Sequence, residues 1–208
     1  MEIKVCGMRD LENIQRLVSE VNPDWMGLIF YPRSPRFVAV GKAEGLKEIP
    51  VKKVGVFVNE NEDEILRIVE KSGISAIQLH GNESSEFIKN LSEKTDCELW
   101  KVISVGAEID WKSLENYLPF VSKFLFDTAT PVHGGSGRKF DWTILETYPF
   151  DKGFLLSGGL DEDSADEVLA LRKQIPQLQG VDLNSKFEEA PGLKNIEKLK
   201  RFTKIIRP

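Results

Sequence analysis

The chain has 208 residues, of which 41% are hydrophobic and 29% charged, and this length and composition suit one globular domain over residues 1–208. The formal net charge is −5, with acidic and basic residues interspersed, so no concentrated positive field favours a nucleic-acid backbone. No window approaches about 18 consecutive apolar residues, and no basic leader precedes the apolar run at Ile3. We therefore expect a cytoplasmic protein that binds neither nucleic acid nor a membrane.

Cysteine and histidine are too sparse to suggest a disulfide framework or a metal site. The sequence contains two cysteines, Cys6 and Cys97, and two histidines, His80 and His133, which are far apart in the chain. No spacing among them resembles a zinc site. We expect no metal, and we interpret Cys97 as structural.

Short apolar runs alternate with amphipathic stretches along the whole chain, eight of each. The runs are nearly all apolar, as is typical of buried parallel strands. Among the helical stretches, those near residues 42–48 and 111–115 are expected to be short or partly 3₁₀. The predicted strands are residues 2–6, 25–30, 52–58, 75–80, 98–104, 122–127, 153–157 and 179–183.

Eight strand and helix units fit either a closed (β/α)₈ barrel or an open doubly wound sheet. No strand is followed by a nucleotide fingerprint, because residues 135–140 lack the final glycine of GxGxxG and do not match GxxxxGK[ST]. In a TIM barrel, functional residues lie at the carboxyl ends of the strands, and phosphate binds after strands 7 and 8. The sequence fits the barrel, since Gly158 and Gly159 follow the seventh strand and Asn184 and Ser185 follow the eighth. The alternative for the glycine pair is a tight turn without a ligand.

A thiol and a carboxylate stand at two of the predicted strand ends. Cys6 closes the first strand, and Asp127 closes the sixth directly after an apolar run. Together they suggest an acid/base pair at the mouth of a barrel. A lone cysteine is also common in protein cores, whereas a carboxylate leaving an apolar strand needs a partner or a function.

The sequence resembles the phosphoribosylanthranilate isomerase family over nearly its whole length. Each motif alone is a weak signal. The resemblance is specific because the motifs follow one another in order along the chain, at the spacing of the strands of a barrel. The motifs are Lys4-Val5-Cys6-Gly7, Gly27-Leu28-Ile29-Phe30, Pro32-Arg33-Ser34-Pro35-Arg36, Val54-Gly55-Val56-Phe57-Val58-Asn59, Gln78-Leu79-His80-Gly81, Phe126-Asp127-Thr128, Gly134-Gly135-Ser136-Gly137-Arg138-Lys139-Phe140-Asp141-Trp142, Leu156-Ser157-Gly158-Gly159-Leu160, Gly180-Val181-Asp182-Leu183-Asn184-Ser185 and Ala190-Pro191-Gly192-Leu193-Lys194.

The resemblance implies a cofactor-free Amadori rearrangement in L-tryptophan biosynthesis, converting N-(5-phosphoribosyl)anthranilate to 1-(2-carboxyphenylamino)-1-deoxyribulose 5-phosphate. It implies that Asp127 is the acid that protonates the ring oxygen and that Cys6 is the base that removes the C2 proton. It also implies that Arg36, rather than the solvated Arg33, grips the anthranilate carboxylate. The remaining substrate-binding residues that it implies are His80, Gly135, Gly158, Gly159, Asp182, Asn184 and Ser185.

Other expectations concern the surroundings of this site. The loop from Ala129 to Lys139 is long for a strand-to-helix connection and is expected to close over the substrate. The phosphorylated substrate is the expected partner, and the protein is expected to be a monomer or a homodimer. The chain departs from the family at Lys186, where a glycine is common, so its anion site could differ in shape.

Two alternatives remain at the level of sequence. The histidine-pathway phosphosugar isomerases share the barrel and the phosphate loops, but they would place Asp rather than Cys6 at the end of the first strand. A non-catalytic barrel that binds a phosphorylated ligand is the other alternative, and the presence of Cys6, Asp127 and Arg36 together disfavours it.

Overall fold

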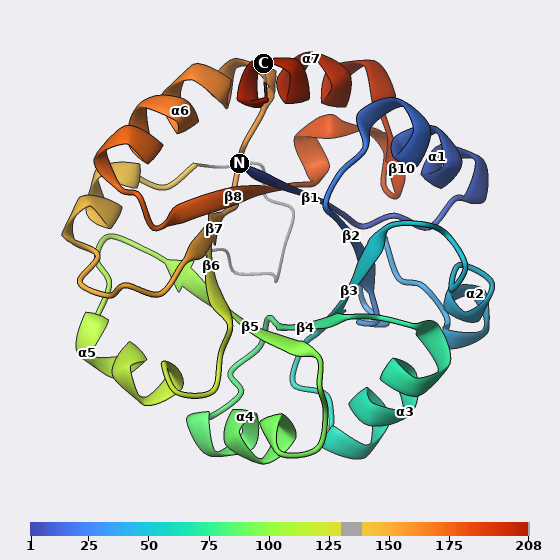
Figure 1. Ribbon diagram of the computed structural model, residues 1–208, viewed down its shortest axis with the longest axis horizontal. Helices are drawn as coiled ribbons and strands as arrows, with labels where there is room; N and C mark the ends of the chain where they lie inside the picture. Colours follow the sequence, from blue (N-terminus) through green and yellow to red (C-terminus); the bar gives the residue numbers. More distant parts are fainter. Residues whose placement is uncertain (130–138, 208) are drawn as a thin grey trace.

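The computed structural model describes residues 1–129 and 139–207, and in these residues the strands close into a barrel. The ring runs in sequence order from β1 to β8, and β8 pairs with β1, with parallel pairing between neighbours throughout (Figure 1). Such closure leaves the barrel no free edge. The strands are β1 (Glu2–Cys6), β2 (Trp25–Ile29), β3 (Lys52–Phe57), β4 (Ala76–Leu79), β5 (Glu98–Val105), β6 (Lys123–Thr128), β7 (Phe154–Leu156) and β8 (Leu178–Leu183).

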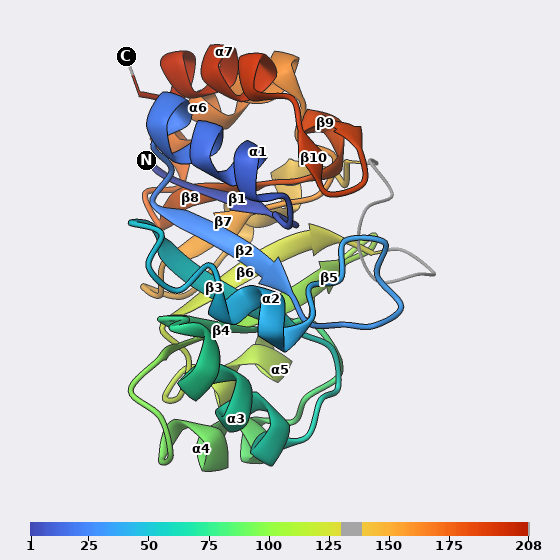
Figure 2. The ribbon, with the colours of Figure 1, turned by 90° about the vertical axis from the view of Figure 1, so that its right-hand side faces the viewer.

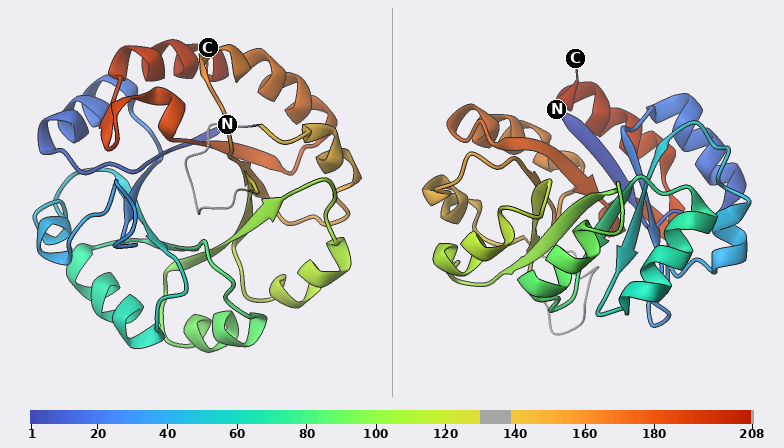
Figure 3. Two further views of the ribbon diagram at one scale, coloured as in Figure 1. Left: turned by 180° about the vertical axis from the view of Figure 1, so that it is seen from behind. Right: turned by 60° about the horizontal axis from the view of Figure 1, so that its bottom comes forward.

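Helices cover the outside of the ring, as Figure 3 shows from behind. α3 illustrates why they form where they do: Asn61 caps its first turn, acidic residues follow the cap, and Gly73 ends it in a left-handed conformation. The α-helices are α1 (Leu11–Arg16), α2 (Val40–Glu44), α3 (Glu62–Ser72), α4 (Ser85–Ser92), α5 (Trp111–Leu114), α6 (Ala165–Gln174) and α7 (Ile196–Ile206). Shorter pieces are the π-helix η1 (Leu17–Val21) and the 3₁₀ helices η2 (Glu115–Tyr117), η3 (Trp142–Thr147), η4 (Glu162–Ser164) and η5 (Ser185–Phe187).

The prediction of a closed barrel is confirmed, and each predicted strand range overlaps an observed strand. The second and fifth helices are short, as expected. In the sixth unit the described residues form the 3₁₀ helix η3 where an amphipathic helical stretch was expected. Tyr148 ends this helix with non-helical backbone, at φ −59° and ψ 116°, and it precedes Pro149, which disfavours helical geometry in the residue before it.

One element was not predicted at all. After β8 the chain forms a small antiparallel hairpin of β9 (Glu188–Ala190) and β10 (Leu193–Lys194). Figure 2 shows the hairpin beside the ends of the barrel strands, above the mouth. Its position brings Glu188 and Lys194 to the edge of the candidate site described below.

The core has two layers because alternate residues of each strand face opposite sides. In β1, Ile3 and Val5 belong to the large cluster between the barrel and its helices, whereas Cys6 belongs to a small separate cluster with Ile29 and Val56. Another separate cluster contains Trp25 and Trp100, whose rings meet edge to face at 4.8 Å, together with Val54, Ala76, Val102, Leu125 and Leu155. These residues fill the barrel interior, so space for a ligand remains at the mouth.

Candidate active site

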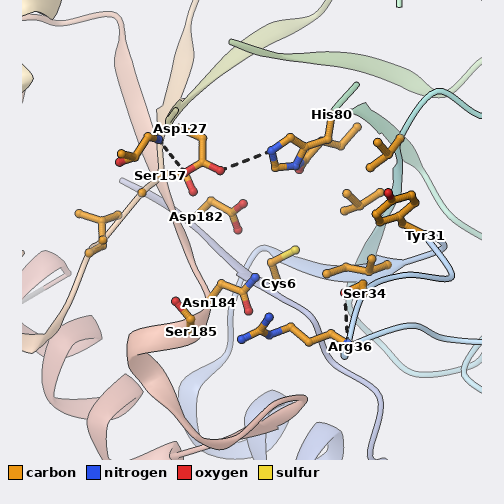
Figure 4. A pocket seen from close by; sticks show the side chains of 18 of the residues that line it. Cys6, Tyr31, Ser34, Arg36, His80, Asp127, Ser157, Asp182, Asn184 and Ser185 are labelled. Atoms are coloured by element: carbon orange, nitrogen blue, oxygen red, sulfur yellow. Dashed lines mark hydrogen bonds and ion pairs between the residues drawn. The ribbon is translucent and has the colours of Figure 1, made fainter. Parts of the chain in front are cut away.

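A pocket opens at the carboxyl ends of the strands and holds about 870 Å³, counting its open mouth. Figure 4 shows the polar side chains that converge on it from different strands. Every predicted site residue that the structure describes lines this pocket: Cys6, Arg36, His80, Asp127, Gly158, Gly159, Asp182, Asn184 and Ser185. Gly135 and most of the 129–139 loop lie outside the described residues.

Cys6 occupies the end of β1 and is only 3% exposed. Its register partner on β2 is Gly27, where an added Cβ would lie 2.7 Å from the sulfur. The absence of a side chain at Gly27 therefore makes the space that the thiol occupies. Burial raises the pKa of Cys6, while the nearby Lys4 and Lys194 ammonium groups pull it down. The raised pKa makes the neutral thiol the favoured form of Cys6.

Lys4 and Asp182 form a buried ion pair below the thiol. Lys4 Nζ donates to Asp182 Oδ2 at 2.8 Å, and the two side chains are 0% and 6% exposed. Burial lowers the pKa of Lys4, but attraction to Asp182 and Cys6 outweighs this and leaves it raised. Within the described part of the chain, the other oxygen, Asp182 Oδ1, is buried without a hydrogen-bond partner. A buried acceptor without a partner beside a pocket is suited to a ligand hydroxyl or amine.

Asp127 faces the pocket from the end of β6. Its Oδ1 accepts from the backbone N–H of Thr128 at 2.9 Å, and its Oδ2 lies 3.4 Å from His80 Nε2. The other ring nitrogen of His80, Nδ1, is 3.5 Å from Gln78 Nε2. Both Asp127 and His80 are 15% exposed, so a ligand can reach them. His80 thus lies in the pocket wall.

Arg36 approaches from the connection between β2 and α2, and its side chain is 10% exposed. Its guanidinium makes paired hydrogen bonds to Glu188, at 2.9 Å from Nε and 2.6 Å from Nη2. Arg33, by contrast, is exposed, as expected. The arginine on the pocket is therefore Arg36.

The loops after β7 and β8 bring small residues to the pocket wall. Gly158 and Gly159 have φ of 85° and 69°, a left-handed backbone that other residues rarely adopt. A Cβ on Gly158 would lie 2.6 Å from the backbone nitrogen of Thr128. Asn184 and Ser185 complete this side, whereas Lys186 is exposed and does not line the pocket. Such a wall lets backbone N–H groups approach an anion.

Sequence comparison places these residues in a known context. Residues 3–205 match the family model described as "N-(5'phosphoribosyl)anthranilate (PRA) isomerase". The chain belongs to this family. N-(5'-phosphoribosyl)anthranilate isomerases from Parabacteroides distasonis and Phocaeicola vulgatus are 41% and 44% identical to it, over 99% and 94% of this chain and 93% and 92% of the relatives.

Solved structures of family members have the same fold. The phosphoribosyl anthranilate isomerase from Thermotoga maritima superposes with a TM-score of 0.86 at 34% identity, covering 100% of this chain and 98% of that one. A second family structure holds reduced 1-(o-carboxyphenylamino)-1-deoxyribulose 5-phosphate, and it superposes with a TM-score of 0.83 at 31% identity over 100% and 98% of the two chains. The predicted resemblance to the isomerase family is thereby confirmed.

Three residues around the pocket were missed at the level of sequence: Lys4, Glu188 and Lys194. Lys4 could have been found, because it stands two residues before Cys6 in a strand and therefore shares its face. Lys194 ends one of the motifs that carry the family resemblance but was given no role, and Glu188 gave no comparable signal, since it lies in a polar segment that reads as a solvated loop. Among residues 1–129 and 139–207, no three His, Cys, Asp or Glu side chains gather as metal ligands. Every helix in those residues is too short or too polar to cross a bilayer.

Proposed function

We propose that the chain catalyses the isomerisation of N-(5'-phosphoribosyl)anthranilate to 1-(2-carboxyphenylamino)-1-deoxyribulose 5-phosphate in tryptophan biosynthesis. The observation that carries the proposal is the convergence of Cys6 and Asp127 on one pocket, in a chain of this family. The reaction moves protons and opens a ring, with no net oxidation of the substrate. An acid and a base therefore suffice for the chemistry.

Asp127 acts first in the proposed mechanism. Its carboxyl group gives a proton to the furanose ring oxygen, the bond from that oxygen to C1 breaks, and the anilino nitrogen supplies the electron pair that forms a protonated Schiff base. His80, 3.4 Å from Asp127 Oδ2, holds the carboxyl group toward the pocket. After the transfer, Asp127 is a carboxylate and the substrate carries the positive charge.

Cys6 completes the rearrangement as the base. Its thiolate removes the proton from C2, and the C2–H electrons form the enolamine, which tautomerises to the ketone. Burial favours the neutral thiol, so the thiolate needs cations close by. Lys4 is one such cation, and the iminium charge created by Asp127 is another. Over the two steps Asp127 loses one proton and Cys6 gains one, so the number of protons on the pair is the same before and after the rearrangement.

Binding is divided between the two sides of the pocket. Arg36 holds the anthranilate carboxylate through parallel hydrogen bonds. The glycine loop after β7, with Asn184 and Ser185, binds the phosphate through backbone N–H groups. Asp182 accepts a hydrogen bond from the sugar or the amine at its buried, unbonded Oδ1.

The cellular setting is part of the proposal. The enzyme works in the cytoplasm, without metal or cofactor, as a monomer or a homodimer. A related structure is described as mutually generated monomers of the dimeric isomerase from Thermotoga maritima, and it is 32% identical with a TM-score of 0.84 over 100% of this chain and 98% of that one.

The direct test is the loss of phosphoribosylanthranilate fluorescence on addition of the purified protein, together with growth rescue of a tryptophan auxotroph that lacks this isomerase. We expect catalytic loss of the fluorescent substrate and growth without tryptophan. The Cys6→Ser/Asp127→Asn double variant is the matched control and should do neither. Wild-type protein that binds the substrate and leaves it unchanged would instead indicate a binding barrel.

A further inference from the structure

Arg36, Glu188 and Lys194 form a buried group of charges at the pocket edge, here called the Arg36 cluster. Glu188 accepts from Arg36 Nε and Nη2, from Lys194 Nζ at 2.5 Å, and from the backbone N–H of Gly192 at 3.0 Å. Lys194 Nζ also donates to Asn184 Oδ1 at 2.8 Å. The Arg36, Glu188 and Lys194 side chains are only 10%, 5% and 0% exposed.

We propose that Glu188 is a positioning residue that orients Arg36 and, with Lys194, selects an aromatic ring carrying a carboxylate. The inference rests on the proposed function and extends it to residues outside the reacting centre. A guanidinium has five N–H donors, and the Glu188 carboxylate occupies Nε and one donor of Nη2. Among residues 1–129 and 139–207, nothing occupies the edge formed by Nη1 and Nη2, which therefore remains for a second carboxylate in the fork geometry that carboxylates prefer.

The charge of the cluster supports an anionic ligand. One carboxylate, Glu188, lies between two cations, Arg36 and Lys194, so one positive charge remains uncompensated when Lys194 is protonated. A buried charge is costly without a counter-ion. A ligand carboxylate bound to the free edge of Arg36 supplies that counter-ion, whereas an unsubstituted ring does not.

The hairpin that carries the cluster has a separate anchor. Asn13 of α1 pairs with the backbone of Lys194 through two hydrogen bonds of 2.8 Å, one accepted by Oδ1 and one donated by Nδ2. Neither bond involves the Glu188 carboxylate. A change of that carboxylate therefore acts on Arg36 while the Asn13 anchor to the hairpin remains.

The test compares two ligands in Glu188→Gln and wild type. The ligands are reduced 1-(o-carboxyphenylamino)-1-deoxyribulose 5-phosphate and its phenylamino counterpart without the carboxylate, and calorimetry measures both dissociation constants. We expect wild type to prefer the carboxylated ligand, and Glu188→Gln to lose about tenfold or more in affinity for that ligand alone. In an Arg36→Met background, Glu188→Gln should cause no further loss of this preference.

Three outcomes would overturn the inference. An unchanged preference in Glu188→Gln would remove Glu188 from recognition, and equal weakening of both ligands would make its role structural. Tighter binding of the carboxylated ligand would show that net charge, which the substitution makes more positive, dominates over orientation.

A second variant guards against misfolding. Glu188→Gln/Lys194→Met removes one charge of each sign, so the net charge of the cluster is kept and no lysine is left buried without its carboxylate. We expect it to melt close to wild type and still to lose the preference. Retention of the wild-type preference by this variant would overturn the positioning role. If wild type itself neither binds the carboxylated ligand nor turns over substrate, the proposed function fails instead.

Discussion

Lys4 and Asp182 are register partners on the adjacent strands β1 and β8, and their side chains meet inside the barrel at 2.8 Å. Parallel pairing thus fixes a cation two residues from Cys6 on the same face of β1. The pair does more than satisfy two buried charges. Its ammonium lowers the pKa of the Cys6 thiol against the burial that raises it.

Lys4→Met should move the pH dependence of the reaction. Loss of the cation raises the pKa of Cys6 further, so the acidic limb of the kcat/KM profile should shift to higher pH and activity at neutral pH should fall. The variant also leaves Asp182 buried without its partner, at a cost of about 3–5 kcal/mol. Lys4→Met/Asp182→Asn is the control because it removes both charges. If the acidic limb of the kcat/KM profile lay at its wild-type pH in both variants, Lys4 would have no role in activating the thiol.

Cys6→Ser and Asp127→Asn should each lower kcat by roughly 10²- to 10⁴-fold, the range for loss of one acid or base. Both substitutions nearly preserve side-chain size, so circular dichroism and melting temperature should stay close to wild type. Steady-state kinetics with phosphoribosylanthranilate provide the measurement. Near-normal turnover by a folded variant would mean that its residue is neither acid nor base.

Much of this site could be predicted because chain order alone brings strand ends together. Cys6 and Asp127 are far apart in sequence, yet each ends an apolar strand, and a closed parallel barrel brings all such ends to one mouth. The sequence pattern did not show that the helical stretch of the sixth unit is a 3₁₀ helix, which ends where Tyr148, the residue before Pro149, leaves helical geometry.

The partners of Arg36 could not be predicted in the same way. Glu188 and Lys194 become buried only because a hairpin of three- and two-residue strands folds back over the mouth. Elements this short carry no periodicity that predicts which side chain turns inward. Their ion pair depends on tertiary contacts, including the two hydrogen bonds from Asn13.

Arg36→Met should act mainly on substrate capture. A carboxylate on the ring, remote from the sugar carbons that react, is bound similarly in the ground and transition states. KM should therefore rise by more than kcat falls, and the thermal stability of the variant should be measured alongside because Glu188 loses its paired hydrogen bonds to Arg36 and keeps those to Lys194 and Gly192. A defect confined to kcat would place Arg36 at the reacting centre instead.

Substrate binding should weaken at alkaline pH because Lys194 loses its proton. Burial lowers its pKa to about 8, although Glu188 pulls it upward. Above this pH the ammonium loses its proton, the Arg36 cluster becomes neutral, and KM for the anionic substrate should rise. The folded form has the lower pKa, so folding should gain stability relative to Lys194→Met as pH rises from about 8 toward the unfolded value of 10.5. The KM of Lys194→Met should not change across the same range; a parallel rise in both proteins would point to another group.

Lys186→Gly tests the position where this chain departs from its family. Lys186 lies in the 3₁₀ turn η5, is exposed, and is absent from the pocket lining, whereas its neighbour Ser185 is part of it. If the ammonium bound the phosphate from this position, its contribution would be about 1 kcal/mol and would weaken as salt is added. Because the backbone N–H groups of the two loops suffice for an anion, we expect the KM of Lys186→Gly to equal that of wild type at low and moderate salt. A several-fold rise in KM at low salt alone would instead make Lys186 a phosphate ligand.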